Sequence, residues 1–301
     1  MTHSAPRPRR SILRLILRFI ATVAVAATLL ASAACSSPDP SAPRTSTAIE
    51  QPPQVSVDVL QTRSDQGDDI LTLMVTNGGQ DPFTVTDLVV ESGFFAAAPH
   101  WTGTTVVPPG LAKALRVPLP EPGCDATAFD ATARLSAEVG ASTFDISLAA
   151  TDSLDAMQRI NTSRCALARV DAIAGLRFAD VVQTEVVDGH PIALLELDIT
   201  PRGAAGSFTI DTVGSTLLLY QSPDPTRVLG VTVNAGDPPS VVVLRYVPGR
   251  CDPHAVAEDK LGTRLPFTVT IAGEIPVDVA IGASPELKAR IFSYISDYCG
   301  R

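Results

Sequence analysis

Four cysteines constrain this chain more than any other feature, because they recur in the same order in two halves. Cys124 and Cys251 are each followed by an aspartate, and a lone cysteine, Cys165 or Cys299, follows each of them further along the chain. An even number of cysteines is typical of an oxidising compartment, although four cysteines allow three different pairings. The repeated order favours the disulfides Cys124–Cys165 and Cys251–Cys299, each of which closes one half of the chain on itself.

Six short segments of the first half recur in the second half in the same order. Each match alone is weak, but their common order indicates an internal duplication. We therefore expect two related domains, at residues 55–170 and 171–301, because the chain is long enough for two cores. The matches are Val59–Thr62 with Val181–Thr184, Ile70–Leu73 with Leu194–Leu197, Phe83–Val85 with Phe208–Ile210, Leu115-Arg116 with Leu244-Arg245, Arg134-Leu135 with Arg264-Leu265, and Phe144–Ile146 with Val277–Val279.

Both halves show the pattern of short β-strands. Val55, Val57 and Val59 alternate with polar residues, which is the period of a half-buried strand. Asp65–Asp68 and Asn77-Gly78-Gly79 are typical turn sequences. Strands and turns at this spacing predict an all-β fold of two β-sandwiches. Further strands are expected at residues 70–76, 83–90, 113–117, 132–139 and 143–148, the last two as a hairpin.

A short helix is expected to close each half. Ser284 is a suitable N-cap with Pro285 as the first helical residue, and Thr151 or Asp152 would cap a weaker copy in the first half. The second cysteine of each pair would then lie at the end of its helix. The residues expected to face the core are Leu287, Ile291, Ile295 and Tyr298 in the second helix and Leu154, Met157 and Ile160 in the first.

The residues after the first cysteine of each pair predict a helical turn. Asp252 can cap a turn that begins at Pro253 and continues to Lys260, and Asp125 would do the same in the first half. Arg116 and Arg245, which the duplication aligns, are expected to lie on a sheet face or to pair with nearby acids such as Asp125.

The first 34 residues have the layout of an export signal. Five arginines precede an apolar run that is shorter than the roughly 20 residues of a membrane-spanning helix. Arg9–Arg14 resembles the twin-arginine export motif, and the general secretory route is the alternative. Ser32-Ala33-Ala34-Cys35 resembles the lipobox of bacterial lipoproteins, with Ser32 where that family usually has leucine. The resemblance implies that Cys35 carries lipid on the outer face of the cell membrane, whereas cleavage after Ala33 would release a secreted protein.

Residues 35–54 are expected to form a flexible tether, because Ser, Pro, Thr and Ala dominate after Cys35 and large apolar side chains are nearly absent. The chain has a net charge of −9, from 32 acidic and 23 basic residues, and five of the basic residues lie in the export signal. An acidic surface is a poor partner for nucleic acid and for anionic lipid headgroups. We therefore expect no nucleic-acid partner.

The pattern Leu-x-Leu-x-Val-Thr-Asn-Gly-Gly at residues 71–79, followed by a strand that contains Phe83, resembles immunoglobulin-like domains of bacterial surface proteins. Together with Cys251-Asp252-Pro253-His254, it resembles uncharacterised secreted proteins of high-GC Gram-positive bacteria. The resemblance covers most of residues 55–301. It implies tandem immunoglobulin-like β-sandwiches, each closed by its helix and disulfide, and it implies no activity.

Few residues carry a chemical signature. The sequence contains no Gly-x-Ser-x-Gly elbow, no phosphate-binding glycine loop and no dinucleotide fingerprint. His254 and Glu258 could share a helix face, but a second histidine is missing nearby and Cys251 is assigned to a disulfide. No catalytic residue, metal site or cofactor is therefore predicted.

Trp101 is the best single candidate for a binding contact. It lies at residues 99–103, which we expect to form a loop together with His100, and His190 is expected in a second loop. The alternative is that Trp101 covers a sheet edge or fills one end of the core.

These features favour a non-enzymatic, lipid-anchored cell-surface protein that binds an extracellular protein or an envelope component. One alternative is a secreted hydrolase or carbohydrate-processing enzyme with catalytic residues in its loops, and another is a structural spacer. An exposed apolar patch would favour binding over a spacer.

Overall fold

Two pairs of antiparallel sheets, each pair around its own core, make up the described part of the protein. The computed structural model describes residues 51–257 and 259–300. The fold is mostly β, as the sequence predicts. The expected export signal, the lipidation site Cys35 and the tether as far as residue 50 lie outside the described residues.

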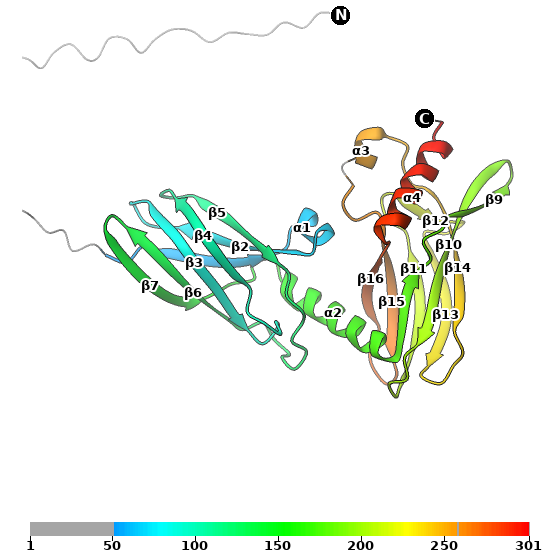
Figure 1. Ribbon diagram of the computed structural model, residues 1–301, viewed down its shortest axis with the longest axis horizontal. Coiled ribbons are helices and arrows are strands. Elements are labelled where there is room, and N and C mark those ends of the chain that lie inside the picture. Colours follow the sequence, from blue (N-terminus) through cyan, green and yellow to red (C-terminus); the bar gives the residue numbers. More distant parts are fainter. Residues whose placement is uncertain (1–50, 258, 301) are drawn as a thin grey trace, which may run out of the picture. The chain divides into compact units, whose positions relative to one another are not determined.

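The first half packs two sheets face to face as a β-sandwich (Figure 1). One sheet has the strand order β1-β2-β5 and the other β4-β3-β6-β7, and buried side chains from both form one continuous core. The elements are β1 (Val55–Leu60), α1 (Arg63–Gly67), β2 (Ile70–Asn77), β3 (Phe83–Ser92), β4 (His100–Val107), β5 (Ala112–Pro118), β6 (Ala131–Val139), β7 (Ser142–Ala149) and α2 (Ala156–Ile173). The expected hairpin of β6 and β7 is present.

The second half is a larger sandwich around a second core. One sheet has the order β12-β14-β10-β8, with β9 paired to β10, and the other has the order β13-β11-β15-β16. The elements are β8 (Ala174–Phe178), β9 (Gln183–Val187), β10 (His190–Pro201), β11 (Ser207–Gly214), β12 (Leu219–Gln221), β13 (Thr226–Asn234), β14 (Ser240–Pro248), α3 (Pro253–Ala257), β15 (Arg264–Ile271), β16 (Val277–Gly282) and α4 (Pro285–Tyr298).

The strand order of the first half repeats in the second. Strands β1-β2-β5 correspond to β8-β10-β14, and β4-β3-β6-β7 correspond to β13-β11-β15-β16. The register shifts at the same place in both copies, between Val85 and Asp87 of β3 and between Ile210 and Thr212 of β11. A β-bulge at one position of two otherwise unrelated strands is improbable, so this shared irregularity supports the duplication.

A cross-strand hydrogen bond also repeats. The hydroxyl of Ser136 on β6 donates to Asp145 on β7 at 2.6 Å. The hydroxyl of Thr268 on β15 donates to Asp278 on β16 at 2.9 Å. The sequence match of Asp145 with Asp278 is therefore correct in register.

Other sequence matches are displaced by two residues. Leu73 pairs with Leu115, whereas Leu244 pairs with Leu195 and not with Leu197, so the matches for these strands cannot both hold. Counted from the bulge, Leu135 likewise corresponds to Phe267 and not to Leu265. A shift of two residues leaves every side chain on the same face of its sheet, so the alternation of apolar residues cannot reveal it.

Helix α2 is much longer than the short closing helix that the sequence predicts. It has 18 residues, and Cys165 lies in its middle and not at its end. Leu154 lies before the helix and is 62% exposed, so its expected place in the core is wrong. Asp152 does cap the first turn, because its carboxylate accepts the backbone N–H groups of Ala156 and Met157.

The buried side chains of α2 belong to two different cores. Ala156 and Met157 lie in the core of the first half, and Ala166, Val170 and Ile173 lie in the core of the second. Met157 and Ala166 are nine residues apart, which is about two and a half helical turns, so the two sets face opposite sides of the helix. The expected domain boundary between residues 170 and 171 falls inside this helix.

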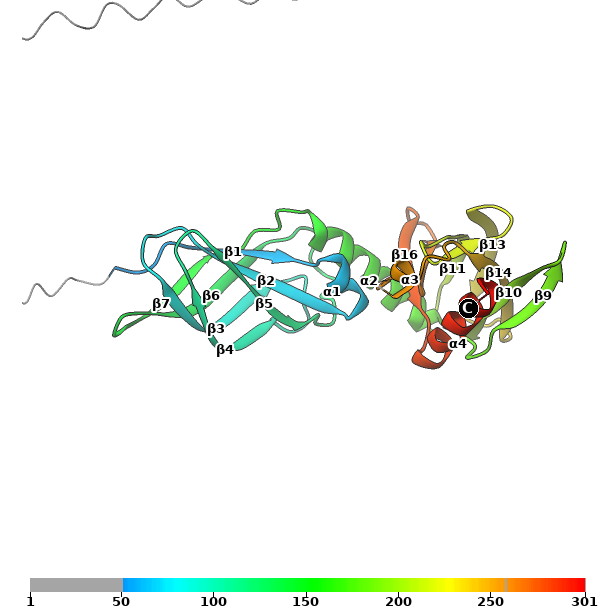
Figure 2. The ribbon, with the colours of Figure 1, turned by 90° about the horizontal axis from the view of Figure 1, so that it is seen from above.

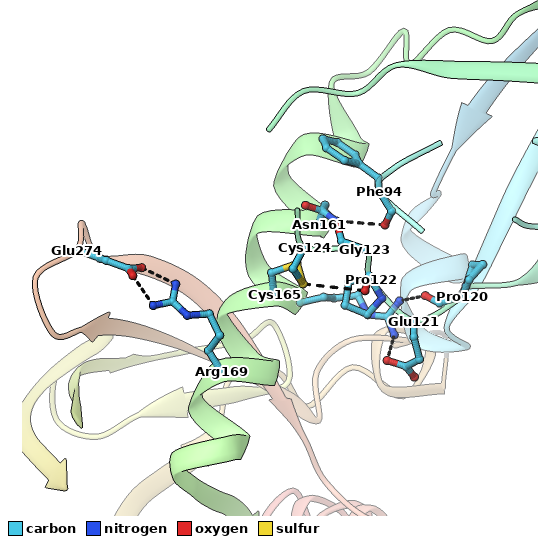
Figure 3. The surroundings of a disulfide bond; sticks show 11 residues. Phe94, Pro120, Glu121, Pro122, Gly123, Cys124, Asn161, Cys165, Arg169 and Glu274 are labelled. Carbon is cyan, nitrogen blue, oxygen red and sulfur yellow. Dashed lines mark hydrogen bonds and ion pairs between the residues drawn. A yellow bond between two sulfur atoms is a disulfide. The ribbon is translucent and has the colours of Figure 1, made fainter. Parts of the chain in front are cut away.

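Both expected disulfides are present, between Cys124 and Cys165 and between Cys251 and Cys299. Each ties the segment that follows β5 or β14 to the closing helix of the same half. On α2, Asn161 adds hydrogen bonds to the carbonyls of Phe94 and Gly123, at 3.1 and 2.9 Å (Figure 3). Further along α2, Arg169 forms an ion pair with Glu274 in the β15–β16 turn (Figure 3).

Three short segments differ from expectation. Residues 63–67 form the helix α1 and not a plain turn, because Thr62 and Asp65 make a reciprocal capping box. No helix follows Asp125 in the described chain. Asp125 is followed by Ala126, whereas Asp252 is followed by Pro253, which favours the start of a helix. Helix α3 does begin at Pro253 but does not reach Lys260.

Arg116 and Arg245 pair with acids, but not with Asp125. Arg116 contacts Asp65 of α1 at 2.8 Å, and Arg245 contacts Glu185 of β9. Asp65 lies between β1 and β2, and Glu185 lies between the corresponding strands β8 and β10. The aligned arginines therefore have the structural role that the duplication predicts, with different partners.

Candidate functional site

The β9–β10 hairpin is a feature of the second half alone. Its turn, Asp188-Gly189, has φ angles of 52° and 80°, and consecutive positive φ values at Asp-Gly are typical of a tight hairpin. This hairpin occupies the place in the repeat that α1 occupies in the first half. It carries exposed apolar side chains, of which Val186 is 73% exposed.

Helix α4 faces the hairpin and begins where the sequence predicts. Ser284 is the N-cap, its hydroxyl accepting the N–H of Leu287 at 3.0 Å, and Pro285 follows it. Leu287, Ile291 and Ile295 are buried as expected, and the end of the helix is fixed by the disulfide of Cys299.

Tyr294 joins α4 to the hairpin. Its ring is 7% exposed, and its hydroxyl lies 2.9 Å from the carbonyl oxygen of Pro191 and 3.2 Å from that of Tyr246, either of which can accept its hydrogen. Burial raises the pKa of Tyr294 to about 12, so the phenol stays neutral and acts as a donor. Tyr294 thus holds the helix against β10 and β14 at a fixed distance.

A groove lies between α4 and the hairpin, and we call it the α4 groove. Its volume is about 390 Å³, which is within the range of small-ligand sites. Figure 1 shows α4 and β9 at the same end of the second sandwich, and Figure 2 views that end from above. The groove is lined by Val182, Thr184 and Pro191 from the hairpin region and by Arg290, Ser293, Tyr294, Asp297 and Tyr298 from α4.

The α4 groove combines an aromatic floor with charges of both signs. The rings of Tyr294 and Tyr298 have centroids 6.0 Å apart, and the ring of His190 lies 6.4 Å from that of Tyr298. Arg290 and Asp297 are exposed at the groove rim. Their seven-residue separation is about two turns of helix and about 10 Å along its axis, so both lie on the same side of α4.

The groove is not among the features that the sequence predicts. Arg290, Tyr294 and Tyr298 are spaced by four residues, so they lie along one side of the helix. Tyr298, which is expected to face the core, is only half-buried and also lines the groove. That spacing was a usable signal for a polar and aromatic helix face. The opposite wall, formed by Val182, Thr184 and Pro191, was not predictable, because nothing in the sequence distinguishes these residues from those of other strands.

Trp101 and His100 lie in strand β4, so their expected placement in a loop is wrong. His190 is likewise the first residue of β10. Trp101 pairs with Leu88 and packs against the core of the first half, which agrees with the alternative role of covering a sheet edge. Its ring lies against Gly103, where an added Cβ would come within 2.7 Å of the indole.

A row of polar side chains crosses the sheet that contains β4. His100 lies 2.7 Å from Asp87, and the hydroxyl of Ser136 donates to Asp145 at 2.6 Å. A serine nucleophile needs the histidine as its own hydrogen-bond partner. Because Ser136 is bonded to an aspartate and His100 to a different aspartate, this row does not have the arrangement of a catalytic triad.

The described residues lack a metal-binding cluster and a membrane-spanning helix. Residues 51–257 and 259–300 contain no group of three or more His, Cys, Asp or Glu side chains placed to hold a metal ion. Within the same ranges, none of the helices combines the length and apolar character needed to cross a bilayer.

Comparison with known proteins gives no family. No protein-family model matches this sequence, and no curated protein does. Several solved structures are similar, and three of them illustrate how low the TM-scores are. The YadV chaperone has a TM-score of 0.20 and 11% identity, covering 75% of this chain and 99% of that one. The CsuC-CsuE chaperone–tip adhesion subunit complex of Acinetobacter baumannii Csu pili has 0.17 and 9%, covering 70% and 91%, and calcium binding domain CBD12 of CALX1.1 has 0.18 and 13%, covering 74% and 79%. At these TM-scores the likenesses carry no argument about this chain.

Proposed function

We propose that this protein is a lipid-anchored, non-enzymatic binding protein of the bacterial cell surface, made of two immunoglobulin-like domains. The α4 groove is the observation that carries the proposal. Its ligand would be an extracellular protein or a component of the cell envelope. The repeated strand order and bulge support a tandem of one domain type.

The polar groups of the α4 groove have unused bonding capacity. In the described part of the chain, the side chains of Arg290 and Asp297 and the hydroxyl of Tyr298 make no ion pair or hydrogen bond. Other arginines of the second half, such as Arg177 and Arg245, are paired with acids. Polar side chains that gather in one groove without mutual pairing suit contact with a ligand better than support of the fold.

The anchoring part of the proposal rests on Cys35 in its lipobox-like context. Expressed with its signal in a bacterial host, the wild type should partition into detergent, and its intact mass should match a chain that begins at a lipid-modified Cys35. A Cys35→Ser variant should stay in the aqueous phase. A soluble wild-type protein that begins at or near Ala34 would refute the anchor.

The binding part can be tested with cell envelopes of the native host. The mature chain should be retained by washed envelopes, and the double variant R290A/D297N should lose at least tenfold in apparent affinity. The matched control is K288A/E286Q, which also removes one charge of each sign from exposed positions on α4 but outside the groove. Equal retention of wild type and R290A/D297N would show that the groove is not the binding site, and no retention of either would refute envelope binding.

A further inference from the structure

We infer that the α4 groove takes a neutral saccharide. This inference rests on the proposed binding function and narrows its ligand to one chemical class. Three properties of the groove lead to it: its balance of charge, its hydroxyl groups and its aromatic floor.

The charge balance disfavours ligands of a single sign. An anion would lie beside Asp297 on a chain whose net charge is −9, and a cation would lie beside Arg290. Guanidinium only donates hydrogen bonds and carboxylate only accepts them. A sugar hydroxyl can do both, so one polyhydroxylated neutral ligand can satisfy Arg290 and Asp297 together.

Neutral hydroxyl groups outnumber the charges in the groove. Thr184, Ser293 and Tyr298 each present a hydroxyl, and none of the three has a hydrogen-bond partner within the described residues. A zwitterionic peptide could also pair with Arg290 and Asp297, but it would leave these hydroxyls with few partners. A saccharide offers a donor and an acceptor at each of its hydroxyls.

The aromatic floor matches the apolar face of a sugar ring. The axial C–H groups of a pyranose form an apolar patch that stacks on an aromatic ring. Tyr298 is half-buried and is held between Tyr294 and His190, so its orientation is fixed before a ligand arrives. Fixed aromatic rings bind with a small loss of conformational entropy.

The test is calorimetric titration of the full mature chain with defined probes. The neutral probes are tetrasaccharides of glucose (α- and β-linked), mannose and N-acetylglucosamine, together with the neutral glycan fraction of the native host's wall. The comparators are tetragalacturonate, which is anionic, and the dipeptide Ala-Ala, which is zwitterionic. We expect at least one neutral probe to bind and both comparators to fail at the same concentration.

Four variants assign that binding to the groove. R290A/D297N and Tyr298→Ala should each lose at least tenfold in affinity. Tyr298→Phe keeps the ring and removes only the hydroxyl, so it should lose less affinity than Tyr298→Ala but more than the control K288A/E286Q, which should stay within twofold of wild type. Unchanged circular dichroism and melting temperature would show that each variant is folded.

Several outcomes would overturn the saccharide inference. They are the absence of binding by every neutral probe, binding of Ala-Ala or tetragalacturonate in preference to them, and equal binding by wild type and R290A/D297N. Host envelopes that retain all variants equally would leave the surface-binding function standing and remove only the groove from it.

Discussion

The two halves of this protein share a strand order but differ in the segment that joins β1 to β2 in the first half and β8 to β10 in the second. In the first half that segment is α1, which brings Asp65 to Arg116. In the second half it is the β9 strand of a hairpin, which brings Glu185 to Arg245. Each half thus has an ion pair between an arginine of β5 or β14 and an acid of this segment, whereas the surface built around the pair differs.

The two acids are placed in different environments. The side chain of Asp65 is 4% exposed, and it accepts hydrogen bonds from the backbone and hydroxyl of Thr62 and from the hydroxyl of Thr72. Burial alone raises the pKa of Asp65, but these hydrogen bonds and the charge of Arg116 outweigh it and hold the pKa below its ordinary value. The side chain of Glu185 is 36% exposed.

The closing helices differ as well. Helix α4 buries one face against one core, whereas α2 buries opposite faces in two cores. The first copy of the repeat therefore uses its closing helix as part of the next copy. The 18-residue helix α2 therefore joins the two sandwiches in place of a flexible linker.

The chain offers a separate optical probe for each half. Its single tryptophan, Trp101, lies in the first half, and its four tyrosines, Tyr220, Tyr246, Tyr294 and Tyr298, lie in the second. Tryptophan fluorescence excited at its red edge reports unfolding of the first half, and tyrosine signals report the second. In urea titrations, the Trp101 transition therefore gives the unfolding free energy of the first half, and the tyrosine transition gives that of the second half.

The largest effects are expected from the matched core phenylalanines. Phe83 lies near the start of β3, and Phe208 lies at the corresponding position near the start of β11. Each of the two side chains is 1% exposed. Phe83→Ala should lower the free energy of unfolding seen by Trp101 by about 3–5 kcal/mol, and Phe208→Ala should do the same for the tyrosine signal. Equal loss in both signals for either variant would show that the halves unfold as one unit.

The disulfides should separate the roles of the two helices. Removal of a native bridge from a small secreted domain costs roughly 2–5 kcal/mol. Cys299→Ser should lower only the tyrosine transition by this amount. Cys165→Ser should lower the Trp101 transition and, because α2 also packs in the second core, move the tyrosine transition too. A tyrosine transition unchanged by Cys165→Ser would contradict the shared role of α2.

Replacement of Asp65 should cost more unfolding free energy than replacement of Glu185, because Asp65 is buried and Glu185 is partly exposed. Asp65→Asn removes a charged acceptor from three hydrogen bonds and should cost roughly 1.5–3 kcal/mol in the Trp101 transition. Glu185→Gln should cost less than about 1 kcal/mol in the tyrosine transition, as expected for a partly exposed ion pair. Similar losses would mean that the hydrogen bonds of Asp65 add little to its ion pair.

The smallest effect is a difference in acid sensitivity. Because the pKa of Asp65 is lower in the folded chain than its ordinary 3.8, its contribution to stability is present above pH 3.8 and is lost as the pH falls through the folded pKa. The Trp101 transition of wild type should therefore weaken more on acidification in this range than that of Asp65→Asn. Parallel acid curves for the two proteins would refute this role.

The sequence predicted the elements whose signals are local. The cap at Ser284, the alternation of Val55, Val57 and Val59 and the β6–β7 hairpin all depend on neighbouring residues, and each is present. The cysteine pairs followed from the duplication, which is also a property of the chain itself. The register of the repeat was less accessible, because a slip of two residues preserves the pattern.

The sequence missed features whose signals cancel or are absent. Strand β4 contains His100, Thr102, Gly103 and Thr104, which are all exposed, so no alternation marks it. Helix α2 shows no single apolar stripe, because the residues it buries in one core lie opposite those it buries in the other. The α4 groove depends on a hairpin and a helix that are about 100 residues apart, and no local pattern joins them.

The two opposite buried faces of α2 limit how this chain can evolve. Each residue inserted into or deleted from the helix between Met157 and Ala166 turns one buried face by about 100° relative to the other. Changes of three, four or seven residues nearly restore the phase, whereas changes of two or five residues bury polar side chains in one of the cores. The length of α2 can therefore change only by about a whole number of helical turns. Insertions in the surface loops of each sandwich are not limited in this way.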